Sequence, residues 1–321
     1  MKRFDPFLMA LIFAIILASV LPCRGQMQHI LQQAVTILIT LMFFFPGAKL
    51  QRHAIVESVR DWRLQGTVLL CTFALFPVLG VGLHLLFKNI FPDALFGEDL
   101  WSGILFLCCL PSTVQSSIAL TSIARGNVPA AICAATVSNI AGIALTPLLT
   151  GLVLGHGNAG HSPLDSVLDV AKELLLPFLL GQILQTWVGP IVRRHKFLIS
   201  FTDRGSIVVV VYTAFSSAVV EGIWHRVSMT HLFEVALLDS ALLALVLFLS
   251  HAMGKGMKQS IESSITLQFC GSKKSLASGV PMASVIFPAS SVGIIVLPLM
   301  MYHQIQLFTC TLLARHYSRR P

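Results

Sequence analysis

Long apolar runs dominate the chain and restrict it to helices inside a lipid bilayer. Of 321 residues, 55% are hydrophobic and 11% are charged, whereas a soluble domain carries about a quarter charged residues. Such runs are predicted to be helical, because an open strand would leave backbone groups unpaired in lipid. Ten runs, each close to the length of about 20 residues that spans a bilayer, lie at 6–22, 29–46, 64–87, 100–123, 129–154, 168–188, 203–222, 230–251, 261–287 and 290–313.

The basic residues between these runs predict the orientation of the chain. When the loops are assigned to alternate sides, sixteen Lys and Arg residues fall on one side and only Arg24, Lys88 and Arg226 on the other. This asymmetry predicts an even number of spans with both termini in the cytoplasm of an inner-membrane protein. The net charge of +8 is scattered over short loops, which indicates contact with membrane lipid and not with nucleic acid.

The most polar stretch, GHGNAGHSPLD at 155–165, lies at the midpoint and separates five runs from five. An odd number of spans in each half makes the halves insert with opposite topology, as in inverted-repeat transporters. We therefore predict repeats at 1–155 and 156–321 within one membrane domain. The basic and apolar N-terminus also fits a cleaved signal peptide, but its removal would leave the first repeat incomplete, which favours an uncleaved helix.

The fourth run contains a polar interruption. Pro111 is followed by Ser112, Thr113, Gln115, Ser116 and Ser117. Proline removes a helical hydrogen bond, and hydroxyl and amide groups can satisfy the freed backbone or coordinate a dehydrated cation. The alternative is a kinked helix whose hydroxyls only pack against neighbours.

The ninth run contains a sharper interruption at Gly271, Ser272, Lys273, Lys274 and Ser275. Each lysine at membrane depth costs about 2.5–3.5 kcal/mol, so such residues are normally shielded and functional. The alternative is that this span begins later and leaves the lysines in a loop. Two interrupted helices in corresponding places of two halves predict a transporter binding site for a solute or ion.

Several motifs then resemble a known family. PSTVQSSIALTSIARGNVPAA, TVSN, VVYTAFSSAVVEGIWH, CGSKKSLASGVPMA and LPLMMYHQIQL are similar to the SBF-like branch of the bile acid:sodium symporter superfamily. The resemblance covers nearly the whole chain. It implies an all-α integral membrane protein of ten transmembrane helices in two inverted five-helix repeats, with a core and a panel domain and broken, crossing fourth and ninth helices.

The resemblance also implies where cations bind. Sodium ligands would come from Ser116 and Ser117 on the fourth helix, from Thr136, Ser138 and Asn139 on the fifth, and from the 268–274 stretch on the ninth. The family's sodium-coupled members carry a Glu and a Gln on the ninth helix, where this chain has Phe269 or Cys270 and Lys273 or Lys274. The complete predicted substrate and ion site is Ser112, Thr113, Gln115, Ser116, Ser117, Thr136, Ser138, Asn139, Gln268, Ser272, Lys273, Lys274 and Ser275.

The lysines suggest how the site has changed. A buried ammonium can stand where a bound cation would sit, so Lys273 or Lys274 is predicted to replace one sodium. The chain would then be sodium-independent, proton-coupled or dependent on one remaining site. The same lysine could instead bind an organic anion, the usual cargo of the superfamily. The coupling ion is therefore Na⁺ or H⁺, and no other cofactor is predicted.

Other polar residues within the runs receive weaker interpretations. Asp239 and Glu173 are alternative proton carriers, whereas Gln182, Gln185, Gln304 and Gln306 are interpreted as hydrogen-bonding links between helices.

The sequence bears on three functional classes. The leading one is a secondary active transporter that moves a small organic anion or related solute by alternating access, because no nucleotide-binding motif supplies energy. An intramembrane enzyme is disfavoured, because no run offers a nucleophile with a base, paired carboxylates or metal ligands. A non-transporting regulator linked to calcium homeostasis is the other alternative, since animal relatives of this branch are associated with calcium handling. The oligomeric state has no sequence signal.

Overall fold

The computed structural model describes residues 6–49, 62–90, 98–155, 163–194, 196–222 and 227–320. Within these ranges the regular structure is entirely helical. Several sequence predictions fall outside the described residues, namely those on Lys2, Arg3, Arg52, Arg60 and Arg226 and on residues 156–162 of the polar midpoint.

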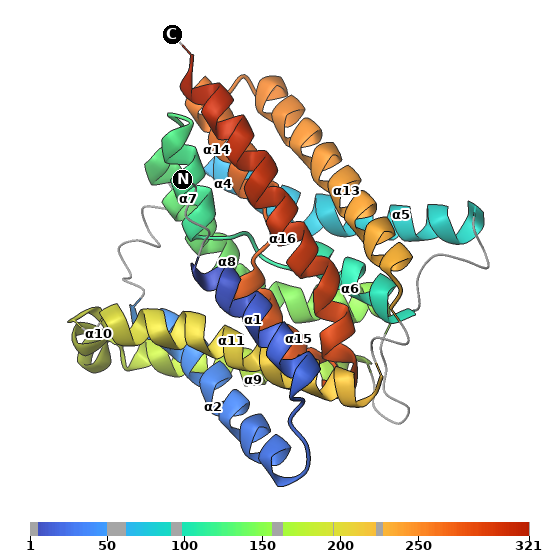
Figure 1. Cartoon of the computed structure of the whole chain (residues 1–321). Helices are drawn as coiled ribbons and strands as arrows, with labels where there is room; N and C mark the ends of the chain where they lie inside the picture. Colours follow the sequence, from blue (N-terminus) through green and yellow to red (C-terminus); the bar gives the residue numbers. More distant parts are fainter. Residues whose placement is uncertain are drawn as a thin grey trace. The chain divides into compact units, whose positions relative to one another are not determined.

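Each of the ten predicted runs coincides with a helix or with consecutive helices (Figure 1). In chain order these are α1 (Pro6–Val20), α2 (Gln26–Lys49), α4 (Trp62–Leu70), the π-helical turn η2 (Cys71–Leu75), α5 (Phe76–Ile90), α6 (Glu98–Cys109), α7 (Gln115–Ile123), α8 (Val128–Leu154), α9 (Pro163–Ile183), α10 (Gln185–Arg194), α11 (Lys196–Val220), α13 (Met229–Gly256), α14 (Ile261–Gly271), α15 (Leu276–Ile286) and α16 (Ala289–Ser318). The fourth run is broken at 110–114 and the ninth at 272–275, which confirms both predicted interruptions.

Five of the described helical segments are long and apolar enough to cross a membrane. They are Gln26–Ala48, Trp62–Phe87, Val128–Leu154, Met229–Gly256 and Ala289–Ser318, and a sixth is added if α9 and α10 form one bent span. Met9–Val20 and Arg204–Val220 are shorter apolar helices. The chain is therefore a multi-pass helical protein, and the arrangement of ten spans as inverted repeats stays a prediction.

The run at 168–188 differs from the single straight span that the sequence predicts. Its helices α9 and α10 meet at a bend of 91°. The bend lies at Leu184, and α10 combines apolar residues such as Trp187 and Ile191 with the polar residues Gln185, Arg193 and Arg194. The segment after Ile183 is thus amphipathic, which suits a helix at the membrane interface better than the continuation of an apolar span.

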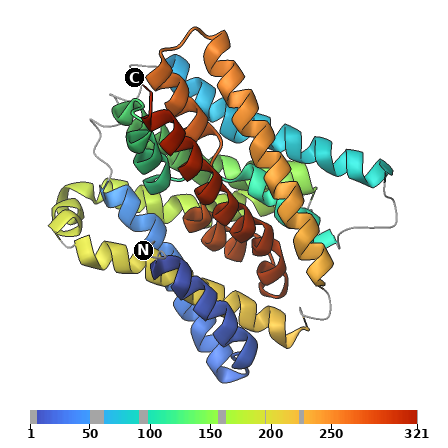
Figure 2. The ribbon, with the colours of Figure 1, turned by 45° about the horizontal axis from the view of Figure 1, so that its top comes forward.

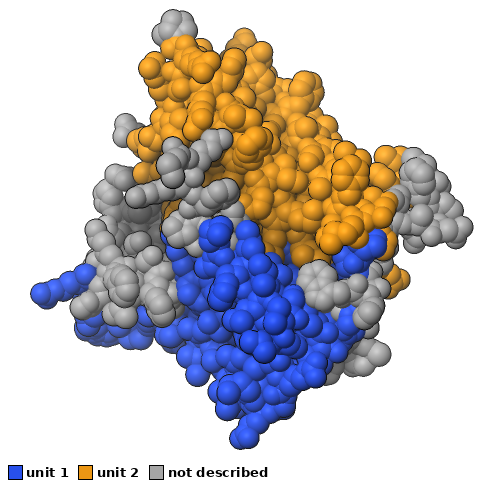
Figure 3. Space-filling model, viewed as in Figure 1, with its two compact units in different colours: residues 1–50, 165–228, 280–296 blue, residues 51–164, 229–279, 297–321 orange. Residues whose placement is uncertain are grey.

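The chain forms two compact units, and each takes segments from both halves of the sequence (Figure 3). Unit 1 consists of residues 1–50, 165–228 and 280–296, and unit 2 of residues 51–164, 229–279 and 297–321. The boundary falls inside α15 and inside α16. These interleaved units are not the two predicted repeats, so the division at residue 155 stays a prediction.

In unit 1, α11 packs against α1 and α2, as both ribbon views show (Figures 1 and 2). Side chains also link these helices. The Tyr212 hydroxyl donates to Leu21 O at 2.9 Å, and the Gln28 amide donates to Ser217 Oγ at 3.3 Å. The N-terminal helix is therefore an integral part of this unit.

In unit 2, α14 packs against α4, α7, α8 and α13. Its inner face joins a buried apolar cluster that includes Leu64, Cys71, Ala131, Leu267 and Cys270. Small residues in this cluster allow the helix backbones to approach closely, which is the main source of helix association in lipid. Both helix breaks lie in this unit.

Candidate functional site at two helix breaks

The two breaks lie directly against each other. The Ser275 N–H donates to Pro111 O at 2.9 Å, and the Ser112 hydroxyl donates to Cys270 O at 2.6 Å. Each break therefore uses polar groups of the other to satisfy its freed backbone. This reciprocity explains how non-helical backbone is tolerated inside an apolar protein, where each unpaired group would be costly.

Helix α8 holds the first break in place. The Ser138 hydroxyl accepts from Ser112 N–H at 3.0 Å, and the Asn139 amide donates to Ser112 O at 2.7 Å. Asn139 Oδ1 also accepts from the Ser278 hydroxyl at 2.9 Å, which links α8 to α15. A side chain at Gly142 would bring a Cβ within 2.7 Å of the Pro111 ring. The glycine thus permits α8 to pass closely over the break.

A hydroxyl cluster lies at the start of α7. Thr113 Oγ1 lies 2.7 Å from Ser116 Oγ and 2.9 Å from Ser117 Oγ. The Ser117 hydroxyl is 3.5 Å from Phe269 O, near the C-terminal end of α14. Thr113 and Ser117 are buried, whereas Ser116 is half-buried. Neutral oxygens beside a helix C-terminus are the groups that coordinate alkali cations in broken-helix transporters.

The ammonium of Lys274 is bound by three backbone carbonyls. Lys274 Nζ donates to Thr72 O at 2.8 Å, to Cys108 O at 2.8 Å and to Leu110 O at 2.7 Å. It also lies 4.1 Å from the centre of the Phe76 ring, within the range of a cation–π interaction. All three donors of this fully buried side chain are therefore used.

Two local features leave the carbonyls of Thr72 and Cys108 free to accept from Lys274. In η2 the Phe76 N–H bonds to Cys71 O, and the next residue is Pro77, which has no N–H, so Thr72 O lacks a helical donor. At the end of α6 the Ser112 N–H, the helical donor for Cys108 O, bonds to Ser138 instead. The ammonium also lies at the C-terminal end of α6, where the helix dipole favours positive charge.

Helix α16 fixes the backbone of the second break. Gln306 accepts from Lys274 N–H at 2.9 Å and donates to Lys274 O at 2.9 Å, while the Tyr302 hydroxyl donates to Ser272 O at 2.8 Å. The predicted role of Gln306 as a link between helices is thereby confirmed. Lys274 is held through both its main chain and its side chain.

Lys273 has a different environment. Its side chain is also fully buried, and its ammonium interacts electrostatically with the thiols of Cys270 and Cys310. Among the described residues, however, this ammonium has no hydrogen-bond partner. The same unit also contains Asp239, which is completely buried on α13 near Tyr302. Lys273 is thus a buried amine for which the described residues supply no hydrogen-bond acceptor.

The side chains of Thr136 and Gln268 form hydrogen bonds elsewhere. Thr136 donates to Ile132 O within α8 at 2.8 Å, and Gln115 is exposed at the start of α7. Gln268 donates to Leu247 O at 3.0 Å and accepts from the Tyr317 hydroxyl at 2.7 Å. It therefore ties α14 to α13 and α16. Among the predicted sodium ligands, Ser116 and Ser117 belong to the hydroxyl cluster of α7, whereas Ser138 and Asn139 bond to the backbone of Ser112. Their role in ion binding stays a prediction.

Sequence reasoning missed the acceptors of Lys274. Backbone carbonyls occur at every residue, so those of Thr72, Cys108 and Leu110 carry no signature of their own. Two signals did exist: Pro77 lies inside an apolar run, and Pro111 begins the first break. A proline in a span leaves a carbonyl without its helical donor, which is a reason to search for a buried cation nearby.

Unit 1 contains a cavity of about 200 Å³ whose lining is partly apolar and partly polar. Its polar lining comes from Gln32 and Thr36 of α2, Glu173 of α9, Thr213 and Ser217 of α11 and Ser284 of α15. Glu173, predicted as an alternative proton carrier, is the carboxylate in this lining. The cavity is large enough for a small solute and offers hydrogen-bonding groups from four helices.

Comparison with known proteins gives consistent matches along the chain. The model of the SBF-like CPA transporter family (DUF4137) matches residues 5–319. An uncharacterised protein of Pseudomonas aeruginosa is 48% identical over 317 residues, which cover 98% of this chain and 93% of that protein. The Escherichia coli K12 protein named "Putative symporter YfeH" is 48% identical over 316 residues, with the same coverage. "Sodium/bile acid cotransporter 7" of Danio rerio is 26% identical over 314 residues, covering 95% of this chain and 91% of that protein.

Proposed function

Since the chain belongs to the SBF-like CPA transporter family, a family of membrane transporters and not of enzymes, we propose that it is a secondary active transporter in which Lys274 permanently occupies one cation site. The transported species is a small solute, of which an organic anion is the leading class. Movement occurs by alternating access across the inner membrane.

The binding of Lys274 by three carbonyls carries this proposal. In broken-helix transporters, unwound carbonyls and helix C-terminal ends coordinate the coupling ion. Here the carbonyls at the end of α6 and in η2 bind an ammonium of the chain itself. An ion at this position would be redundant, because the acceptors already have a positive charge. The site then stabilises the breaks without consuming an ion gradient.

A second position remains for a coupling ion. The hydroxyls of Thr113, Ser116 and Ser117, with Phe269 O, supply neutral oxygens for Na⁺. Lys273 supplies a buried charge that an incoming anion, or the loss of a proton, would neutralise. We assign ion coupling either to the hydroxyl cluster, through Na⁺, or to Lys273, through a proton. We assign the attraction of the anionic solute to Lys273.

The finer architecture of the proposal follows the sequence prediction. Ten helices form two inverted five-helix repeats, both termini are cytoplasmic, and the broken helices cross. The interleaving of the two halves in each unit supports this arrangement, because repeats that exchange segments build two units from both halves.

Transport is tested in proteoliposomes whose internal Na⁺ concentration and pH are fixed. Uptake of labelled small carboxylates, with a bile acid in the panel because of the name of the Danio rerio relative, is measured under a Na⁺ gradient, a pH gradient or neither. We expect saturable uptake that Lys273→Gln abolishes. Solute uptake that needs no gradient would indicate a facilitator. Absence of any flux from folded protein would contradict transport and favour a regulator.

The coupling ion is tested separately by thermal unfolding in detergent, with Na⁺ exchanged for choline at constant ionic strength and at two pH values. A bound ion at a hundredfold excess over its Kd stabilises the fold by about 2.7 kcal/mol. A saturable Na⁺ shift that Ser117→Ala removes would assign coupling to the hydroxyl cluster. A pH response without a Na⁺ shift, lost in Lys273→Gln, would assign it to a proton.

A further inference from the structure

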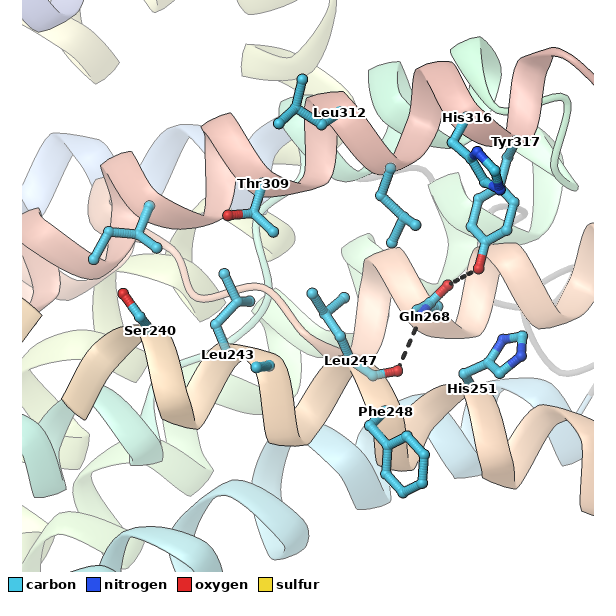
Figure 4. A pocket seen from close by; sticks show the side chains of 13 residues that line it. Ser240, Leu243, Leu247, Phe248, His251, Gln268, Thr309, Leu312, His316 and Tyr317 are labelled. Atoms are coloured by element: carbon cyan, nitrogen blue, oxygen red, sulfur yellow. Dashed lines mark hydrogen bonds between the residues drawn. The ribbon is translucent and has the colours of Figure 1, made fainter. Parts of the chain in front are cut away.

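Unit 2 has a second cavity, far larger than the one in unit 1 and of different chemistry. It is a groove of about 670 Å³ between α13, α14 and α16. Figure 4 shows its lining, which is mainly apolar and includes Leu243, Leu247, Phe248 and Leu312. Phe248 and Leu312 are 70% and 53% exposed. The groove is thus open toward the surroundings of the unit, which for a membrane protein include lipid chains.

One end of this groove is polar. His251, Gln268, His316 and Tyr317 gather there, whereas Ser240 lies toward the other end (Figure 4). Gln268 is fixed by its bonds to Leu247 O and to the Tyr317 hydroxyl, so this end has a rigid wall. A ligand that fits the groove therefore needs an apolar body and one polar end.

The charge beyond the polar end is positive. Lys255 lies one turn after His251 on α13, and Arg319 lies just after the end of α16, one turn beyond His316. Both are exposed. Side chains four residues apart on a helix lie on the same face, so Lys255 lies on the face of His251. The Arg319 N–H bonds to His316 O at 3.2 Å, so this turn keeps Arg319 close to His316, and both cations are near the polar end. Basic pockets between helices on the cytoplasmic side of membrane proteins bind anionic lipid headgroups.

The length of the groove matches half of a bilayer. From Ser240 to His251, and from Ile305 to His316, the two walls each rise about 16 Å. The hydrocarbon of one leaflet is about 15 Å thick. An acyl chain that enters from the cytoplasmic leaflet would therefore fill the groove while its headgroup stayed at the polar end.

We propose that this groove binds one acyl chain of an anionic phospholipid, with the phosphate at the end formed by His251, His316, Lys255 and Arg319. A second copy of the chain is a poorer occupant. Two copies in one membrane share the same orientation, so a symmetric contact through this face would bring their cationic ends together. An anionic lipid instead neutralises them. This site is separate from the helix breaks, and the inference does not depend on transport.

Native mass spectrometry of the protein in detergent tests the proposal, with phosphatidylglycerol and phosphatidylcholine of identical chains as probes. Ala244 lines the groove and is exposed, and Ala119 is exposed on α7, which does not line the groove. We expect Ala244→Trp to lose the retained phosphatidylglycerol, while the matched control Ala119→Trp keeps it. Lys255→Gln and Arg319→Gln should each reduce the preference for phosphatidylglycerol over phosphatidylcholine by about fivefold.

Three results would overturn the proposal. The first is equal retention of the two lipids by the wild type, which would indicate lipid bound by its chains alone. The second is equal retention of phosphatidylglycerol by the two Trp variants, which would place the lipid elsewhere on the surface. The third is a dimer that Ala244→Trp dissociates and Ala119→Trp does not, which would make the groove a contact between copies.

Discussion

Lys273 and Lys274 are neighbours in sequence and both are fully buried, yet the protein treats them in opposite ways. Lys274 uses all three ammonium protons on carbonyls and lies over an aromatic ring, whereas Lys273 has no hydrogen-bond partner among the described residues. A buried ammonium that is fully bonded stabilises the surrounding backbone, and one that is unbonded destabilises it. Burial by itself therefore does not reveal the role of a charge.

The largest expected effect is that of Lys274→Met. This substitution leaves three buried carbonyls without a donor, and each unsatisfied group costs about 1–3 kcal/mol. We expect a fall of many degrees in the apparent melting temperature, measured in detergent, or failure to obtain folded protein. Lys273→Met is the matched control, because it makes the same chemical change one residue away. Equal losses in the two variants would remove the distinction between the lysines.

A second variant at the same site spares the charge of Lys274. Phe76→Leu removes the ring beneath the ammonium and leaves the three carbonyl bonds. We expect a smaller fall in melting temperature, from the loss of a cation–π contact of about 0.5–2 kcal/mol and of some packing. Combined with Lys274→Met, the effect should be less than additive because the two groups interact. Full additivity would show that the ring stabilises the fold without the lysine.

Gln306→Leu should have an intermediate effect. The amide forms two hydrogen bonds to the backbone of Lys274, and their loss leaves a buried N–H and C=O unpaired, at about 1–3 kcal/mol each. We expect lower thermal stability together with faster hydrogen exchange at the second break. Gln304→Leu, two residues away, serves as the control. A stability loss as large in the control would indicate a general effect of removing an amide from α16.

Lys273→Met should change stability in the opposite direction. An isolated buried charge costs several kcal/mol, so an apolar side chain of similar length relieves that cost. We expect a melting temperature at or above that of the wild type, together with loss of the solute uptake measured in proteoliposomes. A destabilised variant would mean that this ammonium has a partner essential for folding. A stable variant with normal uptake would remove Lys273 from the transport mechanism.

Thr136→Ala should have the smallest effect. Its hydroxyl bonds within its own helix, and such a substitution normally changes stability by less than about 0.5 kcal/mol. Ser138→Ala, two residues along α8, removes the acceptor of Ser112 N–H and should cost about 1–3 kcal/mol. The two melting curves are compared with and without Na⁺. A loss of Na⁺ response in Thr136→Ala alone would restore this residue to the ligand set.

Much of the helical framework could be predicted from the sequence, because it depends on local composition. Apolar runs of membrane length predicted the helices with boundaries that differ by up to seven residues, and the polar stretches at 111–117 and 271–275 predicted both breaks. The bend between α9 and α10 was missed, since the apolar character of 168–188 hides the change of direction at Leu184. Gln268 was placed among the site residues because the family resemblance implies cation ligands in the 268–274 stretch. Its amide links three helices and lines the groove of unit 2.

The sequence by itself determined that this chain is helical, where two of its helices are interrupted, and that two lysines lie beside one interruption. These properties follow from side-chain chemistry along a short stretch. Only the tertiary structure decided which lysine is bonded, because the acceptors are backbone carbonyls at Thr72, Cys108 and Leu110, far away in sequence and chemically like every other carbonyl. Their availability depends on a π-turn, on prolines and on the exact packing of α8, which local sequence does not specify.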